Sequence, residues 1–345
     1  MKQIANTSFQ RRQGHYNWVL LAISLGLFSW VLWYAGLSEL IKYLRAADYS
    51  LILLAIPIPL VGLMLRAIRW RLLLLPLGCP SIAVSFSSMM LGYLANNLLP
   101  MRAGEVVRAY GLGQRTSISK SAVLATIVVE RLVDGVVMIL VLSLLFHVFP
   151  MPNWLRFAAI AGGALFSGTA IALILARRRP KRPVEISRAF LSRLPSRWQL
   201  QGASLVDNFL LGLTSFRSST DALNFLLLTV AIWGAEILWF WMVMRAFGIS
   251  LPVFAVALVV AAGAVATMIP ASPGYVGTYE FVLVSVLTVL GLLVAPATAF
   301  AVAIHGLTWL ITSFIGAVCT LNLGVSLKPT YGGLEAEKLG STLTD

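Results

Sequence analysis

Residues 17–37, NWVLLAISLGLFSWVLWYAGL, form an apolar run long enough to cross a lipid bilayer as one helix. About 20 such residues cover the roughly 30 Å of hydrocarbon in a membrane. Similar runs recur along the 345-residue chain, which is 59% hydrophobic, only 11% charged and has a mean hydropathy of +0.88. This composition excludes a water-soluble globular protein and predicts an all-α polytopic integral membrane protein.

A basic leader, residues 1–16, precedes the first run and contains Lys2, Arg11 and Arg12. A cleaved signal peptide is therefore an alternative to a membrane span. The run is longer than the roughly 7–15 apolar residues of a signal peptide, and no small-residue cleavage site follows Leu37. Both observations favour a retained helix.

Five further apolar runs predict membrane spans, which makes six spans with the first. Residues 38–48 lie between the first two spans and have an apolar face, which predicts a short helix in the membrane interface. The second span is expected to end at the basic cluster of Arg66, Arg69 and Arg71. The five runs are residues 49–65, 121–148, 155–176, 221–247 and 295–323.

Two other regions, residues 81–120 and 251–293, predict helical hairpins that re-enter the membrane from one side. Each has two arms around a proline-containing break, which is Pro100 in the first region and residues 270–274, PASPG, in the second. Broken backbone at membrane depth requires protein or a wet cavity to satisfy its amide groups. The second arm of the first region is too polar to face lipid, because it carries Arg102, Glu105, Arg108 and Arg115.

With the hairpins included, the halves 17–148 and 155–323 share one order of elements: span, span, hairpin and span. Three spans per half place the second half upside down relative to the first. This is the inverted-repeat plan of many transporters, in which the site lies between the helix breaks. The alternative is a protein of eight full spans, in which both arms of residues 251–293 cross the membrane.

The basic residues predict the orientation, because Lys and Arg beside spans stay in the cytoplasm. Residues 177–197 hold eight Lys and Arg against one acid, Glu185. We therefore expect a cytoplasmic N-terminus, a cytoplasmic loop at residues 177–220 and a cytoplasmic tail at residues 324–345, in a protein of the cytoplasmic (inner) membrane. The net charge of +13 is explained by this topology and by attraction to anionic lipid, so no nucleic acid is expected as a partner.

Ionisable residues inside the third span are candidates for a site, because each costs about 2.5–3.5 kcal/mol at mid-bilayer. Glu130 and Asp134 are one turn apart and share a helix face, and Arg131 is placed to pair with Asp134. The alternative is that Arg131 neutralises both acids and only holds helices together.

Two more acids lie in predicted membrane segments of the second half. Glu236 is in the middle of the fifth span and Glu280 is in the second hairpin. Neither has a local cation, so the expected partners are Arg102 and Arg108 of the first hairpin. His305, in the last span, is interpreted as a packed core histidine rather than a proton relay.

Three segments together resemble a known family: residues 96–108, NNLLPMRAGEVVR, residues 129–134, VERLVD, and residues 270–280, PASPGYVGTYE. They resemble the flippase-like membrane domain of lysylphosphatidylglycerol synthases of the multiple peptide resistance factor type. That domain also occurs as stand-alone proteins, and the resemblance covers nearly the whole chain. In two-domain relatives a soluble C-terminal domain transfers the aminoacyl group, whereas only about two dozen residues follow Leu323 here. The resemblance implies handling of lipids, not synthesis.

The resemblance and the chemistry of the side chains select one set of candidate substrate-binding residues. Arginines match phosphate oxygens, and acids meet an ammonium group or carry protons. Asparagine, serine and glycine let backbone amides approach a headgroup, although hairpin geometry alone is the alternative for each glycine and proline. No catalytic residue, metal ligand or cofactor is predicted. The set is Asn97, Arg102, Gly104, Glu105, Arg108, Glu130, Arg131, Asp134, Glu236, Ser272, Gly274, Gly277 and Glu280.

Three functions follow from these features. The leading one is translocation or handling of anionic, aminoacylated or related phospholipids across the cytoplasmic membrane. The second is a membrane enzyme that transfers a group to or from a lipid, for which the sequence shows no zinc-protease, Walker or nucleophile-elbow motif. The third is an accessory subunit of a lipid-modifying complex. Expected partners are membrane phospholipids, a lipid-modifying enzyme and a second copy of the chain.

Overall fold

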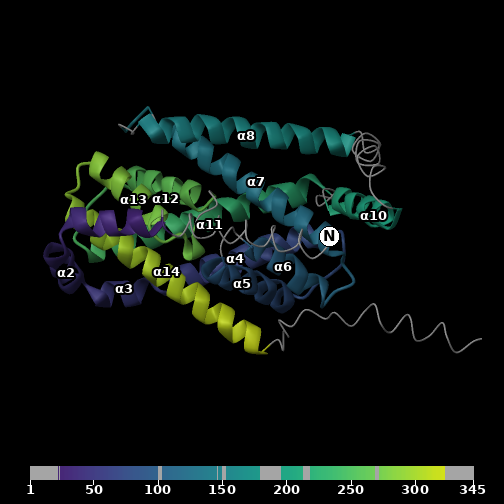
Figure 1. Cartoon of the computed structure of the whole chain (residues 1–345), viewed down its shortest axis with the longest axis horizontal. Coiled ribbons are helices and arrows are strands. Elements are labelled where there is room, and N and C mark those ends of the chain that lie inside the picture. Colours follow the sequence, from purple (N-terminus) through teal and green to yellow (C-terminus); the bar gives the residue numbers. More distant parts are fainter. Residues whose placement is uncertain are drawn as a thin grey trace, which may run out of the picture.

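The computed structural model describes residues 22, 24–99, 103–145, 147–149, 153–178, 196–212, 218–268 and 272–322. Within these ranges the protein is helical and contains no β-strand. Figure 1 shows an elongated bundle in which most helices run roughly along the long axis. The all-α membrane architecture predicted from the apolar runs is confirmed.

The N-terminal helix Ser24–Ala35 is followed by α2 (Leu37–Ala46), and the two are bent by 80°. Gly36 makes the bend with a φ of 74°, a conformation that glycine adopts without strain. Helix α2 buries Leu40 and exposes the pair Glu39 and Lys42. The predicted separate helix after the first span is confirmed, while its place at the membrane interface stays a prediction.

The second apolar element is longer than predicted. It consists of α3 (Tyr49–Ala55) and α4 (Pro57–Leu74), and Pro57 is tolerated because it occupies the first turn of α4. The predicted end at residue 65 is wrong, because α4 continues through Arg66, Arg69 and Arg71. The side chain of Arg69 is only 1% exposed. These arginines therefore do not form a surface cluster that ends the span.

Both predicted hairpin regions are broken helices. The first contains α5 (Ile82–Leu98) and α6 (Gly104–Gly113), and the second contains α12 (Val253–Met268), the 3-10 turn η1 (Pro273–Tyr275) and α13 (Thr278–Val289). Each of these helices is shorter than the roughly 20 residues that cross a membrane. Re-entry from one side and the alternative of eight full spans both stay predictions. The Pro100 break, Arg102, Pro270 and Ala271 lie outside the described residues.

The remaining predicted spans coincide with α7 (Lys120–Leu145), α8 (Asn153–Arg178), α11 (Ser219–Ala246) and α14 (Val294–Asn322). Among the described residues, four helices are long and apolar enough to cross a membrane, or five with the bent N-terminal pair. Helix α7 is 26 residues long but carries four charged residues, Lys120, Glu130, Arg131 and Asp134, so it is not one of them. The sequence did not predict α10 (Ser196–Gly212), which packs on α7 inside the basic loop.

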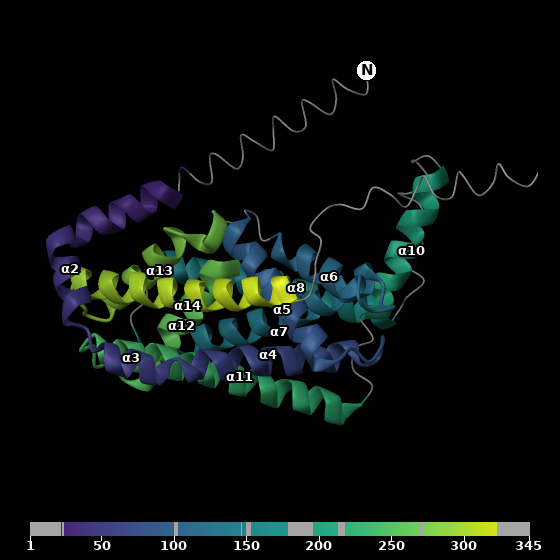
Figure 2. The same ribbon diagram turned by 90° about the horizontal axis from the view of Figure 1, so that it is seen from below.

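The two halves pack against each other reciprocally. Helix α4 of the first half lies along α11 of the second, as Figure 2 shows. The broken helix α5 packs on α14, which closes the second half, and the broken helix α12 packs on α7, which closes the first. Likewise, α2, between the first two spans of its half, packs on α14, and α10, between the first two spans of the other half, packs on α7. Corresponding elements therefore make corresponding contacts, as a repeat predicts.

Two apolar cores hold this arrangement together. The larger one is formed mainly by α11, α12, α13 and α14, and it buries Trp239, Phe240 and Phe300 almost completely. The smaller one is formed by α4, α5, α6 and α7 around Trp70, Met89 and Met90. Polar side chains collect between the two cores, where the halves meet.

Candidate functional site

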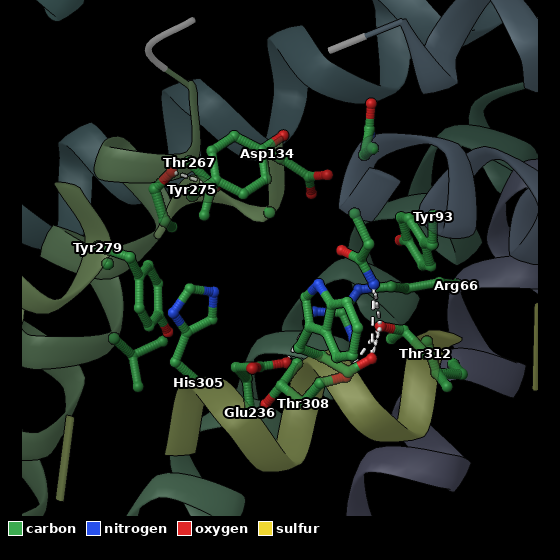
Figure 3. A pocket seen from close by; sticks show the side chains of 18 of the residues that line it. Arg66, Tyr93, Asp134, Glu236, Thr267, Tyr275, Tyr279, His305, Thr308 and Thr312 are labelled. Atoms are coloured by element: carbon green, nitrogen blue, oxygen red, sulfur yellow. Dashed lines mark hydrogen bonds and ion pairs between the residues drawn. The ribbon is translucent and has the colours of Figure 1, made fainter. Parts of the chain in front are cut away.

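A cavity of about 230 Å³ lies between the two halves. Its wall is built from α4, α5, α6, α7, α11, α12, η1, α13 and α14, so both broken regions contribute. In Figure 3, Tyr279 and His305 lie on one side of this space, and Arg66, Tyr93 and Thr312 lie on the other. The lining is mixed, with charged, amide and hydroxyl groups among aromatic rings.

The two helix breaks meet at the cavity. Asn97, near the end of α5, donates from Nδ2 to Oγ1 of Thr312 at 3.0 Å and to Oγ of Ser313 at 2.8 Å, and thereby ties the first break to α14. Gly274 of the second break has a φ of 64°, and a Cβ there would lie 3.4 Å from the Asn97 carbonyl and 3.0 Å from Nε1 of Trp309. The two breaks therefore lie close together, while a site between them stays a prediction.

Gly104 is required by helix packing. Its backbone N–H donates to Oδ1 of Asn96 at 2.8 Å. A Cβ at Gly104 would overlap the carbonyl oxygen of Gly92 and the side chain of Asn96. Gly104 does not line the cavity, so hairpin geometry explains it.

A network of charges reaches the cavity wall through Arg131 and Asp134 and begins at the buried Arg69 of α4. The guanidinium of Arg69 donates to both carboxylate oxygens of Asp134, at 2.6 and 2.8 Å, and to Oγ1 of Thr229 at 3.0 Å. It also lies 3.5 Å from Glu130. Paired, planar contacts of this kind are the strong form of an ion pair.

Glu130 is fully buried and joins three arginines. Arg108 approaches its carboxylate at 2.8 and 3.4 Å, and Arg131 approaches it at 3.2 Å. The predicted pairing of Arg131 with Asp134 is wrong, because Arg69 occupies Asp134. Arg131 instead lies against the neighbouring acid of the same helix.

The predicted pairing of Arg108 with one of the two isolated acids is wrong, whereas the pairing of Arg102 stays a prediction because Arg102 lies outside the described residues. Glu236 accepts from Arg66 of α4 at 2.8 Å, and Glu280 lies 2.6 Å from Nδ1 of His305. Arg108 is engaged by Glu130 instead. His305 was interpreted as a packed core histidine, and the structure adds its contact with Glu280 and its place in the cavity wall.

The second break is held by local hydrogen bonds. Ser272 donates to the carbonyl of Val276 at 3.1 Å, and the N–H of Gly277 donates to Glu280 at 2.7 Å. Gly277 has a φ of 88°, and a Cβ there would overlap the carbonyl of Ser24. Ser272 and Gly277 therefore shape the break, and neither lines the cavity.

Comparison with known proteins identifies the family of the chain. The sequence profile of the lysylphosphatidylglycerol synthase transmembrane region matches residues 17–316. The chain belongs to this family. The resemblance drawn from the three motif segments is confirmed.

Most relatives of the chain are described only as membrane proteins. A UPF0104 membrane protein of Pyrococcus horikoshii is 24% identical over 325 residues, which are 88% of this chain and 96% of that protein. One of Methanothermobacter thermautotrophicus is 24% identical over 349 residues, 94% and 98% of the two chains. Glycosyltransferase AglD of Haloferax volcanii is 28% identical over 331 residues, 85% of this chain and 52% of that protein. No solved structure matches the chain.

Six of the candidate residues of this family member line the cavity, and six lie behind its wall. Arg102 lies outside the described residues, so its place is not known. The candidates that line the cavity are Asn97, Glu105, Arg131, Asp134, Glu236 and Gly274. Those behind the wall are Gly104, Arg108, Glu130, Ser272, Gly277 and Glu280.

Sequence reasoning missed the contribution of α14 and most of the aromatic lining. His305, Thr308, Trp309 and Thr312 all face the cavity. Their spacing of three, four and seven residues puts them on one face of a helix, which is a signal the sequence does contain. Arg66 was also missed, because it was interpreted as marking the end of a span.

Two donors at the cavity lack an acceptor in the described part of the protein. They are Nε of Arg131 and Nε1 of Trp233, and both residues line the cavity. The side chain of Arg131 is 31% exposed, while that of Glu130 beside it is fully buried. Both donor atoms are themselves buried in the wall.

Proposed function

We propose that this protein translocates or handles anionic, aminoacylated or related phospholipids in a flippase-like manner, with the headgroup in the cavity. The observation that carries the proposal is a cavity between apolar helices whose lining includes Arg66 and Arg131, with their guanidinium donors. Phosphate oxygens are strong acceptors for such donors. Arg66 and Arg131 supply positive charge, and Asp134 and Glu236 supply acceptors for an amino group.

The size of the cavity favours a headgroup rather than a whole lipid. Its volume of about 230 Å³ lies below the roughly 300–1,000 Å³ of sites that enclose drug-sized molecules. The acyl chains would remain among the exposed apolar side chains of the helices, such as Leu53, Leu144 and Phe314. This division suits a protein that moves a polar group past a hydrocarbon layer.

The reciprocal packing supports an inverted repeat with two re-entrant hairpins. Helices α5 and α12 each pack against the closing helix of the opposite half. In transporters built on inverted repeats, a site at the repeat interface is exposed to each side in turn. We propose the same alternation here, with six spans and both termini in the cytoplasm.

The proposal is tested by reconstituting the purified protein in liposomes that contain fluorescent phosphatidylglycerol. Movement between leaflets is measured as the fraction of probe that dithionite, added outside, can reach. We expect Arg131→Gln to slow this movement at least tenfold, because one charged hydrogen bond contributes about 1.5–3 kcal/mol.

The matched control is Arg245→Gln, because Arg245 is exposed at the end of α11 and does not line the cavity. It should move the probe at the wild-type rate. If the wild-type protein moves no anionic, aminoacylated or polyprenyl lipid faster than empty liposomes do, the proposal is wrong.

A second candidate is a membrane enzyme that modifies a lipid. It is favoured by the relative named glycosyltransferase AglD, although this chain matches only 52% of that protein. Incubating the reconstituted protein with membrane lipids and activated sugar donors, followed by mass spectrometry, separates the candidates. A new lipid species that depends on Asp134 or Glu236 would favour the enzyme.

A further inference from the structure

A histidine–carboxylate pair forms part of the cavity wall. Glu280 lies in the first turn of α13, and its Oε1 is 2.6 Å from Nδ1 of His305 on α14. Its other oxygen accepts from the N–H of Gly277 at 2.7 Å, which fixes the carboxylate. The side chain of Glu280 is 4% exposed and that of His305 is 13% exposed. Of the two, only His305 lines the cavity.

The first half has a permanent cation, Arg131, at the position related to that of His305. Glu105 lies in the first turn of α6, and Arg131 lies 11 residues after Lys120, where α7 begins. His305 likewise lies 11 residues after Val294, where α14 begins. Because α7 and α14 close the two halves, Arg131 and His305 occupy related positions. The charge of the first is fixed, whereas that of the second depends on pH.

The other titratable groups around His305 are already engaged or lie away from it. The ring of Tyr279 on α13 is tilted by 45° against that of His305, with 4.7 Å between ring centres, and Glu236 of α11 is paired with Arg66 of α4. On α2, which packs against α14, the acid and base Glu39 and Lys42 are exposed and face each other. Helix α12 lines the cavity without a titratable side chain. The remaining titratable groups of the cavity are Tyr93, Glu105, Arg131, Asp134 and Tyr275.

We propose that His305 and Glu280 form a proton-binding site that is coupled to occupation of the cavity by an anionic headgroup. Without an added proton, a neutral imidazole beside a carboxylate carries one negative charge. One proton taken from water and shared between His305 and Glu280 makes the pair neutral. The cavity wall then repels a phosphate less, so lowering the pH strengthens binding of an anionic lipid.

The coupling is reciprocal. If a proton strengthens lipid binding, the lipid strengthens proton binding by the same factor, and the proton leaves when the lipid leaves. Each bound headgroup would thus carry up to one proton with it. This inference rests on the proposed function and adds to it a proton as the coupled ion.

The experiment measures movement of fluorescent phosphatidylglycerol in proteoliposomes with equal pH on both sides, between about pH 5.5 and 8. We expect the wild-type rate to rise about tenfold as the pH falls, a factor within the usual range of site coupling. His305→Asn removes the titratable group and should give a slow rate that does not change with pH. His305→Arg places a permanent cation at this position, as Arg131 does in the first half, and should give a fast rate that does not change with pH.

The matched control is His147→Asn, because His147 is exposed in the turn after α7 and does not line the cavity. It should keep the wild-type pH dependence. A second measurement needs no variant: short-chain phosphatidylglycerol is added to the wild-type protein in weakly buffered detergent with a pH-sensitive dye. Proton uptake on binding is expected.

The outcomes separate this inference from the proposed function. Lipid movement that is independent of pH, lipid binding without proton uptake, or an unchanged pH dependence in His305→Asn would each overturn the proton site and leave the proposed function standing. No binding or movement of any lipid would overturn both. If His305→Arg does not fold, His305→Asn and the proton-uptake measurement decide the question.

Discussion

The ion pair between Arg69 and Asp134 provides a quantitative test of the buried network. Asp134→Asn keeps the shape of the side chain and removes its charge. Arg69, which is 1% exposed, then retains one neutral oxygen, Thr229 at 3.0 Å and Glu130 at 3.5 Å as partners. The buried network of Arg69, Arg108 and Arg131 thereby loses one of its two acids and keeps only Glu130.

The size of the effect follows from burial. Removing one partner of a buried ion pair typically destabilises a protein by about 3–5 kcal/mol, because the other charge stays buried and unpaired. We expect Asp134→Asn to lower the free energy of unfolding by about 3 kcal/mol, since the amide oxygen still accepts one hydrogen bond. Arg69→Met should have a similar or larger effect. The double variant should fall short of the sum of the two by about 2–3 kcal/mol.

The assay is unfolding of the purified protein by sodium dodecyl sulfate in mixed micelles, followed by intrinsic tryptophan fluorescence. Glu39→Gln is the control, because its pair with Lys42 spans 3.7 Å and both side chains are more than half exposed. Its effect should stay below about 1 kcal/mol. Strict additivity of Arg69→Met and Asp134→Asn would refute the reasoning, as would an Asp134→Asn variant as stable as the wild type.

Two further substitutions test the packing around the breaks. Gly104→Ala should destabilise the protein by about 1–3 kcal/mol in the same assay, because the added methyl group meets the carbonyl of Gly92. The control is Gly234→Ala, because a Cβ at Gly234 would have no atom within 4 Å. It should be neutral or stabilise the protein by up to about 1 kcal/mol. A loss of stability equal to that of Gly104→Ala would contradict this account. Asn97→Ala removes the hydrogen bond to Thr312. It should lower the free energy of unfolding by about 1–2 kcal/mol and slow lipid movement. Normal stability together with normal lipid movement would exclude a role for Asn97 in tying the first break to α14.

The sequence predicted the helical membrane architecture and the positions of both breaks, because these depend on local signals. Length and apolar composition predict the helices, and proline and glycine mark where they end. The break in residues 251–293 and the bend after residue 35 follow from such signals. Helix α10 was not predicted, because its surroundings are basic and its packing partner, α7, lies elsewhere in the sequence.

The pairing of charges could not be predicted, because it depends on which helices face each other. Glu236 and Arg66 are separated by 170 residues, and Arg69 and Asp134 by 65. A single sequence gives the face of a helix on which a residue lies and not the helix opposite. One signal was available: residues 72–75, LLLL, continue the apolar run beyond the arginines, which indicates that the helix does not end at residue 65.

The sequence separation of the buried ion pairs sets an order for assembly during synthesis. Arg69 leaves the ribosome well before Asp134, and a lone arginine at mid-bilayer costs about 2.5–3.5 kcal/mol. The first half can neutralise Arg69 and Arg108 once α7 has been made, because their acids lie on that helix. Arg66 must wait for Glu236 and therefore for the second half. The nascent first half thus inserts with Arg66 still without Glu236, which favours its capture by α11 as soon as that helix enters the membrane.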